Sequence, residues 1–474
     1  MYYQLGGFNA AIYSYGRDTL ASRVYWQLRD FQRSGDEGLE LILGIKPTGT
    51  SHILLTRNEK NCLRNVGVRD SPSPASDFES LSPIIFRDVR ELEDKLSALQ
   101  PKPKATCDNS HLNKAYPSAS GPKRGQFENT RVFYRVLQNQ INRSKFDLVD
   151  TSWKASVRVV SFCYNLWILD TRSPQDRRLS PKILDLAWCE AFTPTLETNK
   201  MKIARHVVHS KNQHLNNPDM RRQPTNQPTT PSGEPAKTDS DTDTRARYEF
   251  DGETEICEPQ VMEEMVQEFF SKFSKSEPVV LLVHNKQTAM DIFKSLGVDV
   301  SQWESSLRGL LRDVHSPPPR QAPNDPRRRE SHHDSRGPRR RSASPRRGYE
   351  QRAGRRDPSP PPPKQYAPAY IIDVQSMFHA VFRTDDGAGS VPDIVKRLTV
   401  VDKKFTPTRW CAGNECWMLV EVFRQLAMRG SIDEQKEEWP EPKAPIPPPD
   451  AASGVDEVEQ EEESDYGGSD DDSD

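Results

Sequence analysis

Thirteen arginines and no lysine lie between residues 320 and 356, and they offer the clearest chemistry in this sequence. Guanidinium groups bind phosphates through paired hydrogen bonds and stack on bases, so arginine-rich segments are suited to RNA. We therefore predict that nucleic acid, and RNA in particular, binds this segment. The densest part is PRRRSASPRRG at 338–348. The expected contacts come from five residues there: Arg339, Arg340, Arg341, Arg346 and Arg347.

The same arginine-rich segment has two other interpretations, a nuclear import signal and a solvated loop with no specific partner. Ser342 and Ser344 lie among the arginines, so their phosphorylation would weaken phosphate binding. Residues 456–474 form an acidic tail with eleven carboxylates and no basic side chain. This tail is predicted to compete with RNA for the arginines as an internal polyanion.

The cysteines and histidines are the other groups that could bind a ligand. Zinc sites usually show short, paired ligand spacings, which these residues lack. We therefore interpret the cysteines as core residues and the histidines as structural, with nucleic-acid contact as the alternative for the histidines. The residues concerned are Cys163, Cys189, Cys411, Cys416, His206, His209 and His284.

Composition limits how much of the chain can fold. Only 34% of the 474 residues are hydrophobic and 39 are proline, so long segments cannot bury enough surface to offset their ordering entropy. The net charge of −3 is small because the basic segment and the acidic tail cancel. Seven cysteines without a C-x-x-C pair, and no apolar signal peptide or membrane span, predict a reduced protein of the nucleus and/or cytoplasm that contacts no membrane.

Apolar patterning predicts an α/β fold with a mixed five-stranded sheet flanked by helices. The strands are expected at 156–164, 182–192, 202–210, 277–285 and 369–378. Helices are expected at 131–141, from Pro259 to Phe270, at 286–297 and from Gly413 to Met428. The first three strands are joined by loops short enough for antiparallel neighbours, so they form a meander.

Three regions follow from these elements. Residues 1–126 form an N-terminal region of unknown fold plus a linker, with strand-like runs LELILGI and HILLT and a helical stretch from Asp88 to Leu99. Residues 127–435 form the main domain, with disordered insertions at about 213–247 and 315–367. Residues 436–474 form a disordered acidic tail.

Six segments in order resemble the C-terminal domain of the fungal Gfd-type family, a set of ribonuclease H-like, DEDD exonuclease-like proteins. They are KILDLAWCEA, HVVHSKNQHLNN, FDGET, VVLLVHNKQTAMDIFKSLGVDV, IIDVQSMFHAVF and AGNECWMLVEVFRQLAM. The resemblance covers roughly residues 157–430. It implies the ribonuclease H-like fold and a 3′–5′ exonuclease ancestry, with a role in RNA metabolism or mRNA export beside RNA-processing or export proteins.

The resemblance also assigns the catalytic positions. Asp291 and Glu415 keep family acid positions and would be the metal ligands, with Glu415 replacing an aspartate. The Asp-x-Glu pair of the first strand falls on Cys163 and Asn165, and the catalytic histidine falls on Trp410. Active relatives hold two Mg²⁺ with four carboxylates, so this chain is expected to hold Mg²⁺ or Mn²⁺ weakly or not at all.

Two other acids could replace the missing carboxylates. Asp170 lies seven residues beyond Cys163 and needs a sharp turn to return, whereas Asp185 on the neighbouring strand is closer. The sequence therefore predicts a nucleic-acid-binding, catalytically impaired member of the DEDD superfamily, a pseudoenzyme. The alternatives are an active Mg²⁺-dependent DEDD-type 3′–5′ exonuclease and a protein-interaction scaffold.

Overall fold

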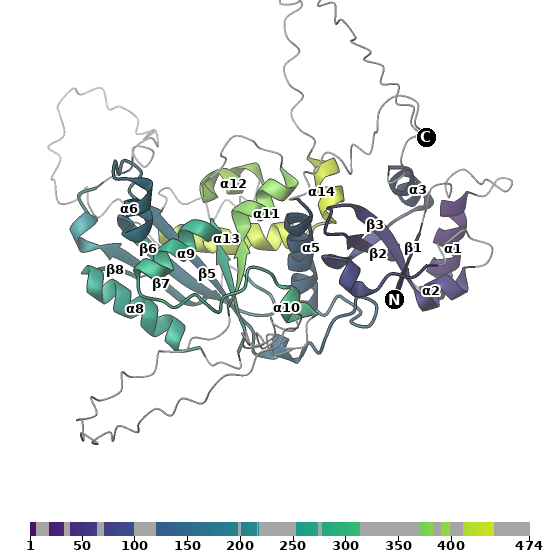
Figure 1. Cartoon of the computed structure of the whole chain (residues 1–474), viewed down its shortest axis with the longest axis horizontal. Helices are drawn as coiled ribbons and strands as arrows, with labels where there is room; N and C mark the ends of the chain where they lie inside the picture. Colours follow the sequence, from purple (N-terminus) through teal and green to yellow (C-terminus); the bar gives the residue numbers. More distant parts are fainter. Residues whose placement is uncertain are drawn as a thin grey trace, which may run out of the picture.

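The computed structural model describes residues 1–5, 19–32, 38–63, 71–98, 120–197, 201–215, 217, 253–273, 277–312, 369–382, 390–398 and 411–439. Trp410, the arginine-rich segment and residues 440–474 of the acidic tail lie outside these residues, as do most of the two predicted insertions. Residues 436–438, predicted to belong to the disordered tail, are instead the end of a helix. The described strands form two separate sheets that lie side by side (Figure 1).

The larger sheet is mixed and has six strands among the described residues. From edge to edge they are β10 (Ala369–Asp373), β9 (Val279–Val283), β5 (Arg158–Leu166), β6 (Ile183–Ala191), β7 (Met201–His209) and β8 (Thr254–Cys257). The meander β5–β6–β7 is antiparallel, whereas β9 pairs in parallel with β5, and β10 in parallel with β9. The predicted α/β class, with a mixed sheet flanked by helices, is thus confirmed.

The sixth strand, β8, is the one that the five-strand prediction missed. It pairs in parallel with β7 at the edge of the sheet, and of its four residues only Cys257 is buried. A strand of this length with exposed polar side chains has too little alternation to stand out in a sequence. By contrast, every residue of β9 is buried, as expected of a parallel strand covered on both faces.

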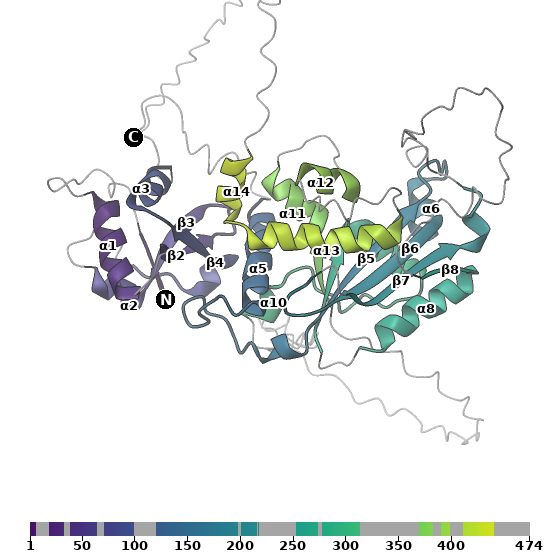
Figure 2. The same cartoon turned by 180° about the vertical axis from the view of Figure 1, so that it is seen from behind.

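Helices cover both faces of the larger sheet. One face carries α13 (Ala412–Met428), with α5 (Ser120–Leu137), α11 (Val374–Val381) and α12 (Val391–Arg397) in the same hydrophobic core. The other face carries α8 (Pro259–Ser271) and α9 (Lys286–Ser295) in a second core. Figures 1 and 2, seen from opposite sides, show α13 crossing one face and α9 lying on the other. The helices α6 (Pro174–Leu179) and α10 (Arg308–Leu311) are short.

Two predicted boundaries were wrong. The strand expected to run to Phe378 stops at Asp373, because the Asp373 carboxylate accepts a hydrogen bond from the Ser376 backbone N–H at 2.7 Å and begins α11. The helix expected from Arg131 begins at Ser120, inside the segment interpreted as a linker.

The smaller sheet is built from the N-terminal residues and is antiparallel, in the order β1 (Tyr2–Gln4), β3 (Ser51–Thr56), β2 (Leu39–Ile45) and β4 (Ser80–Phe86). Three helices pack on one face: α1 (Leu20–Gln32), α2 (Arg57–Cys62) and α3 (Val89–Ala98). Its other face buries Ile42, Leu54 and Leu81 with Phe146, which follows α5. The described N-terminal residues thus form a small α+β arrangement, in which the two strand-like runs are β2 and β3 and the helical stretch contains α3.

Two glycines let the first turns of α5 approach the smaller sheet. A Cβ on Gly121 would clash with the carbonyl oxygen of Pro47, and one on Gly125 would stand 2.5 Å from the Cβ of Glu79. Residues four apart share one face of a helix, so both glycines turn the same side of α5 toward the sheet. The glycines that made this segment resemble a linker are therefore required for the close packing of α5 against the smaller sheet.

A charged cluster at Asp433 fastens the smaller sheet to the rest of the molecule. Asp433 belongs to α14 (Ile432–Glu438), which lies beside α5 between the two sheets in both views (Figures 1 and 2). Its carboxylate accepts hydrogen bonds from Ser51 Oγ at 3.0 Å and Lys95 Nζ at 3.1 Å, and it pairs with Arg124 of α5. One carboxylate therefore joins β3, α3, α5 and α14.

None of the helices in the described part of the chain is long and apolar enough to cross a membrane.

Candidate functional site

The structure brings some of the predicted catalytic positions together on the α13 face of the larger sheet. Cys163, in the middle of β5, is buried, and burial together with a hydrogen bond to Cys416 holds the pKa of its thiol well above the usual value. Cys416 donates its S–H to the carbonyl oxygen of Ala187 at 3.2 Å. Glu415 precedes Cys416, so the substituted first-strand position does lie beside the last helix.

Asn165, the other substituted position, is half-buried and stands directly opposite Asp185 in the β5–β6 pairing. Both residues therefore face the same side of the sheet, because directly opposed residues of an antiparallel pair share a face. The resemblance places an acid on the first strand, β5, whereas the structure has an acid, Asp185, on the neighbouring strand β6. Burial, and then the negative charge of Asp185, raise the pKa of the Glu415 carboxyl well above its usual value.

Asp291 is not brought to this group. It lies on α9, which packs its buried residues against the opposite face of the sheet from α13. Its carboxylate accepts a hydrogen bond from Gln287 Nε2, one helical turn earlier, at 3.1 Å. The groups that shift the pKa of Glu415 are Asp185 and Cys416, and Asp291 is not among them. The two acids predicted to share a metal thus come from helices on different sides of the sheet.

Asp170, the other substitute considered, is held by a neighbour. Arg172 binds it through Nη2 at 2.6 Å and Nε at 3.0 Å. Hydrogen bonding by this guanidinium lowers the pKa of Asp170 to about 2. This carboxylate is therefore fully engaged in closing the loop after β5, where the Arg172 side chain also bonds the carbonyl oxygen of Ser180 at 2.7 Å.

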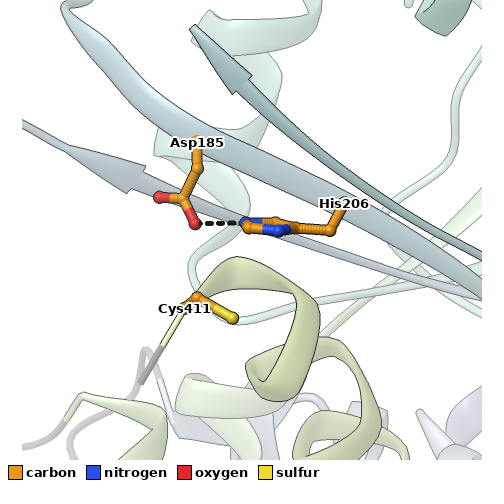
Figure 3. Close-up of side chains that lie close together, drawn as sticks. All are labelled: Asp185, His206 and Cys411. Carbon is orange, nitrogen blue, oxygen red and sulfur yellow. Dashed lines mark hydrogen bonds and ion pairs between the residues drawn. The ribbon is translucent and has the colours of Figure 1, made fainter. Parts of the chain in front are cut away.

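The most ligand-like group of side chains is Asp185, His206 and Cys411, drawn in Figure 3. They come from β6, β7 and the residue before α13, and none is more than 1% exposed. The carboxylate oxygen, ring nitrogen and sulfur that they offer all lie within 4.8 Å of one another. The sequence presents these residues in three distant segments, which is why spacing could not reveal the group.

Sheet geometry explains how Asp185 and His206 meet. In the β6–β7 pairing Asp185 is opposite Val208 and His206 is opposite Ala187, so the two residues are diagonal neighbours on one face. His206 Nε2 lies 2.8 Å from Asp185 Oδ2, and its Nδ1 lies 3.0 Å from Thr254 Oγ1 on β8. Both ring nitrogens are therefore hydrogen-bonded, one on each side.

The start of α13 supplies the third partner. The Ala412 backbone N–H donates to Asp185 Oδ2 at 2.9 Å, which places the carboxylate at the positive end of the helix dipole. Burial, together with the nearby charge of Asp185, raises the pKa of the Cys411 thiol to about 12. The second carboxylate oxygen, Asp185 Oδ1, is buried without a hydrogen-bond partner among the described residues.

This arrangement does not suit a cysteine hydrolase. A nucleophilic thiol needs a hydrogen bond to the imidazole that takes its proton, but both nitrogens of His206 are bonded to Asp185 and Thr254. All three side chains are also buried, so a substrate has no access to the sulfur. The donor types are instead those of a metal site: a carboxylate, an imidazole and a thiol.

A strand pattern could have drawn attention to part of this group. Asp185 sits between Leu184 and Leu186 in a strand whose residues are all buried. A charged residue there must find a partner, because burying an isolated carboxylate is very unfavourable. The partners themselves, His206 and Cys411, carry no such signal.

No family model, no curated protein and no solved structure matches this chain.

Proposed function

We propose that this chain is a nucleic-acid-binding protein whose larger sheet is a ribonuclease H-like domain, derived from a 3′–5′ exonuclease and no longer hydrolytic. The observation that carries the proposal is the strand arrangement. An antiparallel meander β5–β6–β7 is extended on the β5 side by β9 and then β10, both parallel to β5, and the last long helix, α13, crosses β5 and β6. The ribonuclease H-like fold has this order of strands and helices; β8 is an addition to it.

The residues on that scaffold do not fit the two magnesium ions that an exonuclease of this kind would hold. Mg²⁺ requires near-octahedral oxygen ligands, but the β5 positions offer the buried thiol of Cys163 and the uncharged amide of Asn165. Asp185 Oδ2 is already bonded to His206 and to the Ala412 N–H, so Asp185 offers one further oxygen, and Glu415 is the acid kept on α13. This chemistry supports the loss of hydrolysis.

The first test is a nuclease assay on the full-length protein with a 5′-labelled single-stranded RNA or DNA and Mg²⁺ or Mn²⁺. We expect no shortening under conditions in which an active exonuclease digests the same strand. A missing general base alone lowers rates by about 10² to 10⁴, and the first-strand acids are absent as well.

One observation favours the alternative of an active exonuclease: Asp185 faces Asn165 across the strand pair and influences Glu415. Two carboxylates therefore do meet on the α13 face. Digestion by the wild type that disappears in both Glu415→Gln and Asp185→Asn would establish this alternative.

The second test concerns RNA binding by the arginine-rich segment, whose thirteen arginines lie outside the described residues. Substituting Arg339, Arg340, Arg341, Arg346 and Arg347 by glutamine should weaken binding to single-stranded RNA. Each lost phosphate contact reduces the salt slope of log K by about 0.7, so five lower it by up to about 3.5. Fluorescence anisotropy between 50 and 300 mM KCl measures this slope.

The matched control changes the same five residues to lysine. Lysine keeps the charge but loses the planar fork, so the salt slope should stay and only part of the affinity should be lost. If the glutamine variant binds RNA with the wild-type slope, the segment is not an RNA-binding element, and the protein-interaction scaffold becomes the better interpretation.

A further inference from the structure

We propose that Asp185, His206 and Cys411 bind one zinc ion, which clamps β6 and β7 to the start of α13. This site differs from the magnesium site of exonucleases in its residues and its chemistry. It does not depend on the function proposed above, since a ribonuclease H-like scaffold needs no such ion.

The donor set selects the metal class. Imidazole and thiolate favour borderline-soft transition metals, whereas Mg²⁺ and Ca²⁺ prefer oxygen alone. Zinc takes nitrogen, sulfur and carboxylate oxygen together in tetrahedral sites. The Asp185, His206 and Cys411 ligand atoms are close enough to share one ion, since all lie within 4.8 Å of one another (Figure 3).

The buried carboxylate supplies a second, independent observation. Asp185 is fully buried, and its Oδ1 has no hydrogen-bond partner among the described residues. A buried polar atom without a hydrogen-bond partner destabilises the folded protein, and the free-energy cost is larger for a charged group than for a neutral one. A divalent cation beside this carboxylate would offset the deficit, whereas the His206 N–H and the Ala412 N–H reach only Oδ2.

Metal entry requires a small change in the existing contacts. Zinc bonds of about 2.0–2.1 Å to nitrogen and oxygen at the tetrahedral angle separate those ligand atoms by about 3.4 Å. Zinc on His206 Nε2 replaces the proton that this nitrogen shares with Asp185 Oδ2, so their 2.8 Å contact opens; Oδ1 turns to the ion and Oδ2 keeps the Ala412 N–H. This is a side-chain adjustment, and the backbone pairing of β6 with β7 can remain.

The protons balance in a simple way. With a neutral imidazole whose proton is on Nε2, the ion replaces that proton, which moves to Nδ1 and is donated to Thr254 Oγ1. The Cys411 thiol loses its proton as it binds, so one proton is released for each zinc ion. Thr254 then fixes the ring orientation, as outer partners of metal-bound histidines commonly do. A water, or Glu415 after rotation of its side chain, takes the fourth position.

The experiment uses the full-length protein without an affinity tag. Zinc is removed with a chelator, the protein is reloaded with Zn²⁺ or Co²⁺, and the bound metal is measured after gel filtration. We expect about one ion per chain and, for cobalt, the visible bands of a tetrahedral site with a near-ultraviolet thiolate band. His206→Gln and Cys411→Ser should lose the ion, and Cys411→Ser should lose the thiolate band.

Two matched controls come from the same sheet. His209→Gln changes the other described histidine of β7, and Cys257→Ser changes a buried thiol that lies in the opposite core. Both should keep the ion and the cobalt spectrum. Retention of metal by His206→Gln and Cys411→Ser, or a wild type that binds none after reloading, would overturn the proposal.

A third variant keeps the test decisive if the ligand variants do not fold. Thr254 is exposed at the edge of the sheet, so Thr254→Val should leave the fold intact while removing the partner of His206 Nδ1. Loss of such a partner weakens metal affinity by about 10- to 100-fold. Competition with a chromophoric chelator measures this change, and an unchanged affinity would contradict the proposed ligation by Nε2.

Discussion

Replacing Glu128 by leucine destabilises the protein by about 3–5 kcal/mol, because it leaves the Arg131 charge buried without its partner. The two side chains are at most 1% exposed, and Arg131 Nη1 lies 2.5 Å from Glu128 Oε2. Glu128 Oε1 also accepts the Ile432 backbone N–H at 2.7 Å, so this single carboxylate ties α5 to the first residue of α14. Urea unfolding followed by far-ultraviolet circular dichroism measures the loss.

The double variant Glu128→Leu with Arg131→Met separates the buried charge from the lost packing. Removing both charges of a buried pair is often close to neutral, so the part of the loss that comes from the unpaired charge should return. The Ile432 N–H still lacks its acceptor, which keeps a loss of about 1–3 kcal/mol. Arg90→Ala, which breaks an ion pair whose side chains are 89% and 75% exposed, should change stability by less than about 1 kcal/mol. A Glu128→Leu protein that unfolds at the wild-type urea concentration would show that the pair does not fasten these helices.

Asp433→Asn is the second substitution with a large expected effect, about 3–5 kcal/mol, because it removes the buried negative partner that Lys95 and Arg124 share. Glu437 lies 3.9 Å from Lys95, but its side chain is 67% exposed and replaces Asp433 poorly. Burial alone would raise the pKa of Asp433, but the charges of Lys95 and Arg124 and the hydrogen bonds from Lys95 and Ser51 outweigh it. The pKa of Asp433 is therefore held well below its usual value.

The sign of the pH dependence follows from this lowered pKa. A carboxylate whose pKa is lower in the folded state stabilises the protein fully above its unfolded pKa of about 3.9. That stabilisation is lost as the pH falls below this value toward the folded pKa. The difference in unfolding free energy between wild type and Asp433→Asn should thus be constant from pH 7 to 5 and shrink below about pH 4.

An exposed aspartate is the control for this second prediction. Asp94 on α3 has a side chain that is 75% exposed, so Asp94→Asn should change stability by less than about 1 kcal/mol at any of these pH values. If the difference in unfolding free energy between wild type and Asp433→Asn stays the same down to pH 3, Asp433 is not the ionised centre of its cluster.

The sequence was a good guide where burial on two faces leaves a continuous apolar run. This is the case for β9, every residue of which is buried, and β5, β6 and β7 also lie within a few residues of their predicted ranges. It was a poor guide at Asp373, because the apolar run continues through β10 into the buried side of α11. A short apolar run fits a strand or a helix equally well, and only the bond from the Asp373 carboxylate to the Ser376 N–H marks the change.

Tertiary packing explains the remaining misses. Gly121 and Gly125 lower the helix propensity at the start of α5, yet the close approach to Pro47 and Glu79 requires them. The same limit applies to the Asp185, His206 and Cys411 group, whose members meet only after two strands and a helix are in place. The spacing of residues in a sequence reveals ligands that lie on one helix, strand or turn. It did not reveal this group, because β6 and β7 lie far along the chain from α13.

The parallel pairing of β9 with β10 bears on the order of folding. Residues 284–368 separate the two strands along the chain, whereas β5 and β6 are joined by residues 167–182. Closing a long loop forfeits more chain entropy than closing a short one, so the hairpin of β5 and β6 can form before β10 arrives. β10 is also the last strand of the sheet on this side: β9 pairs with one edge of it, and on the other edge Glu304 forms a single bridge, through Glu304 N–H to Ala369 O and Ile371 N–H to Glu304 O, both at 2.8 Å. The sheet can therefore nucleate at its centre, with β10 joining it as a late and well-buried edge.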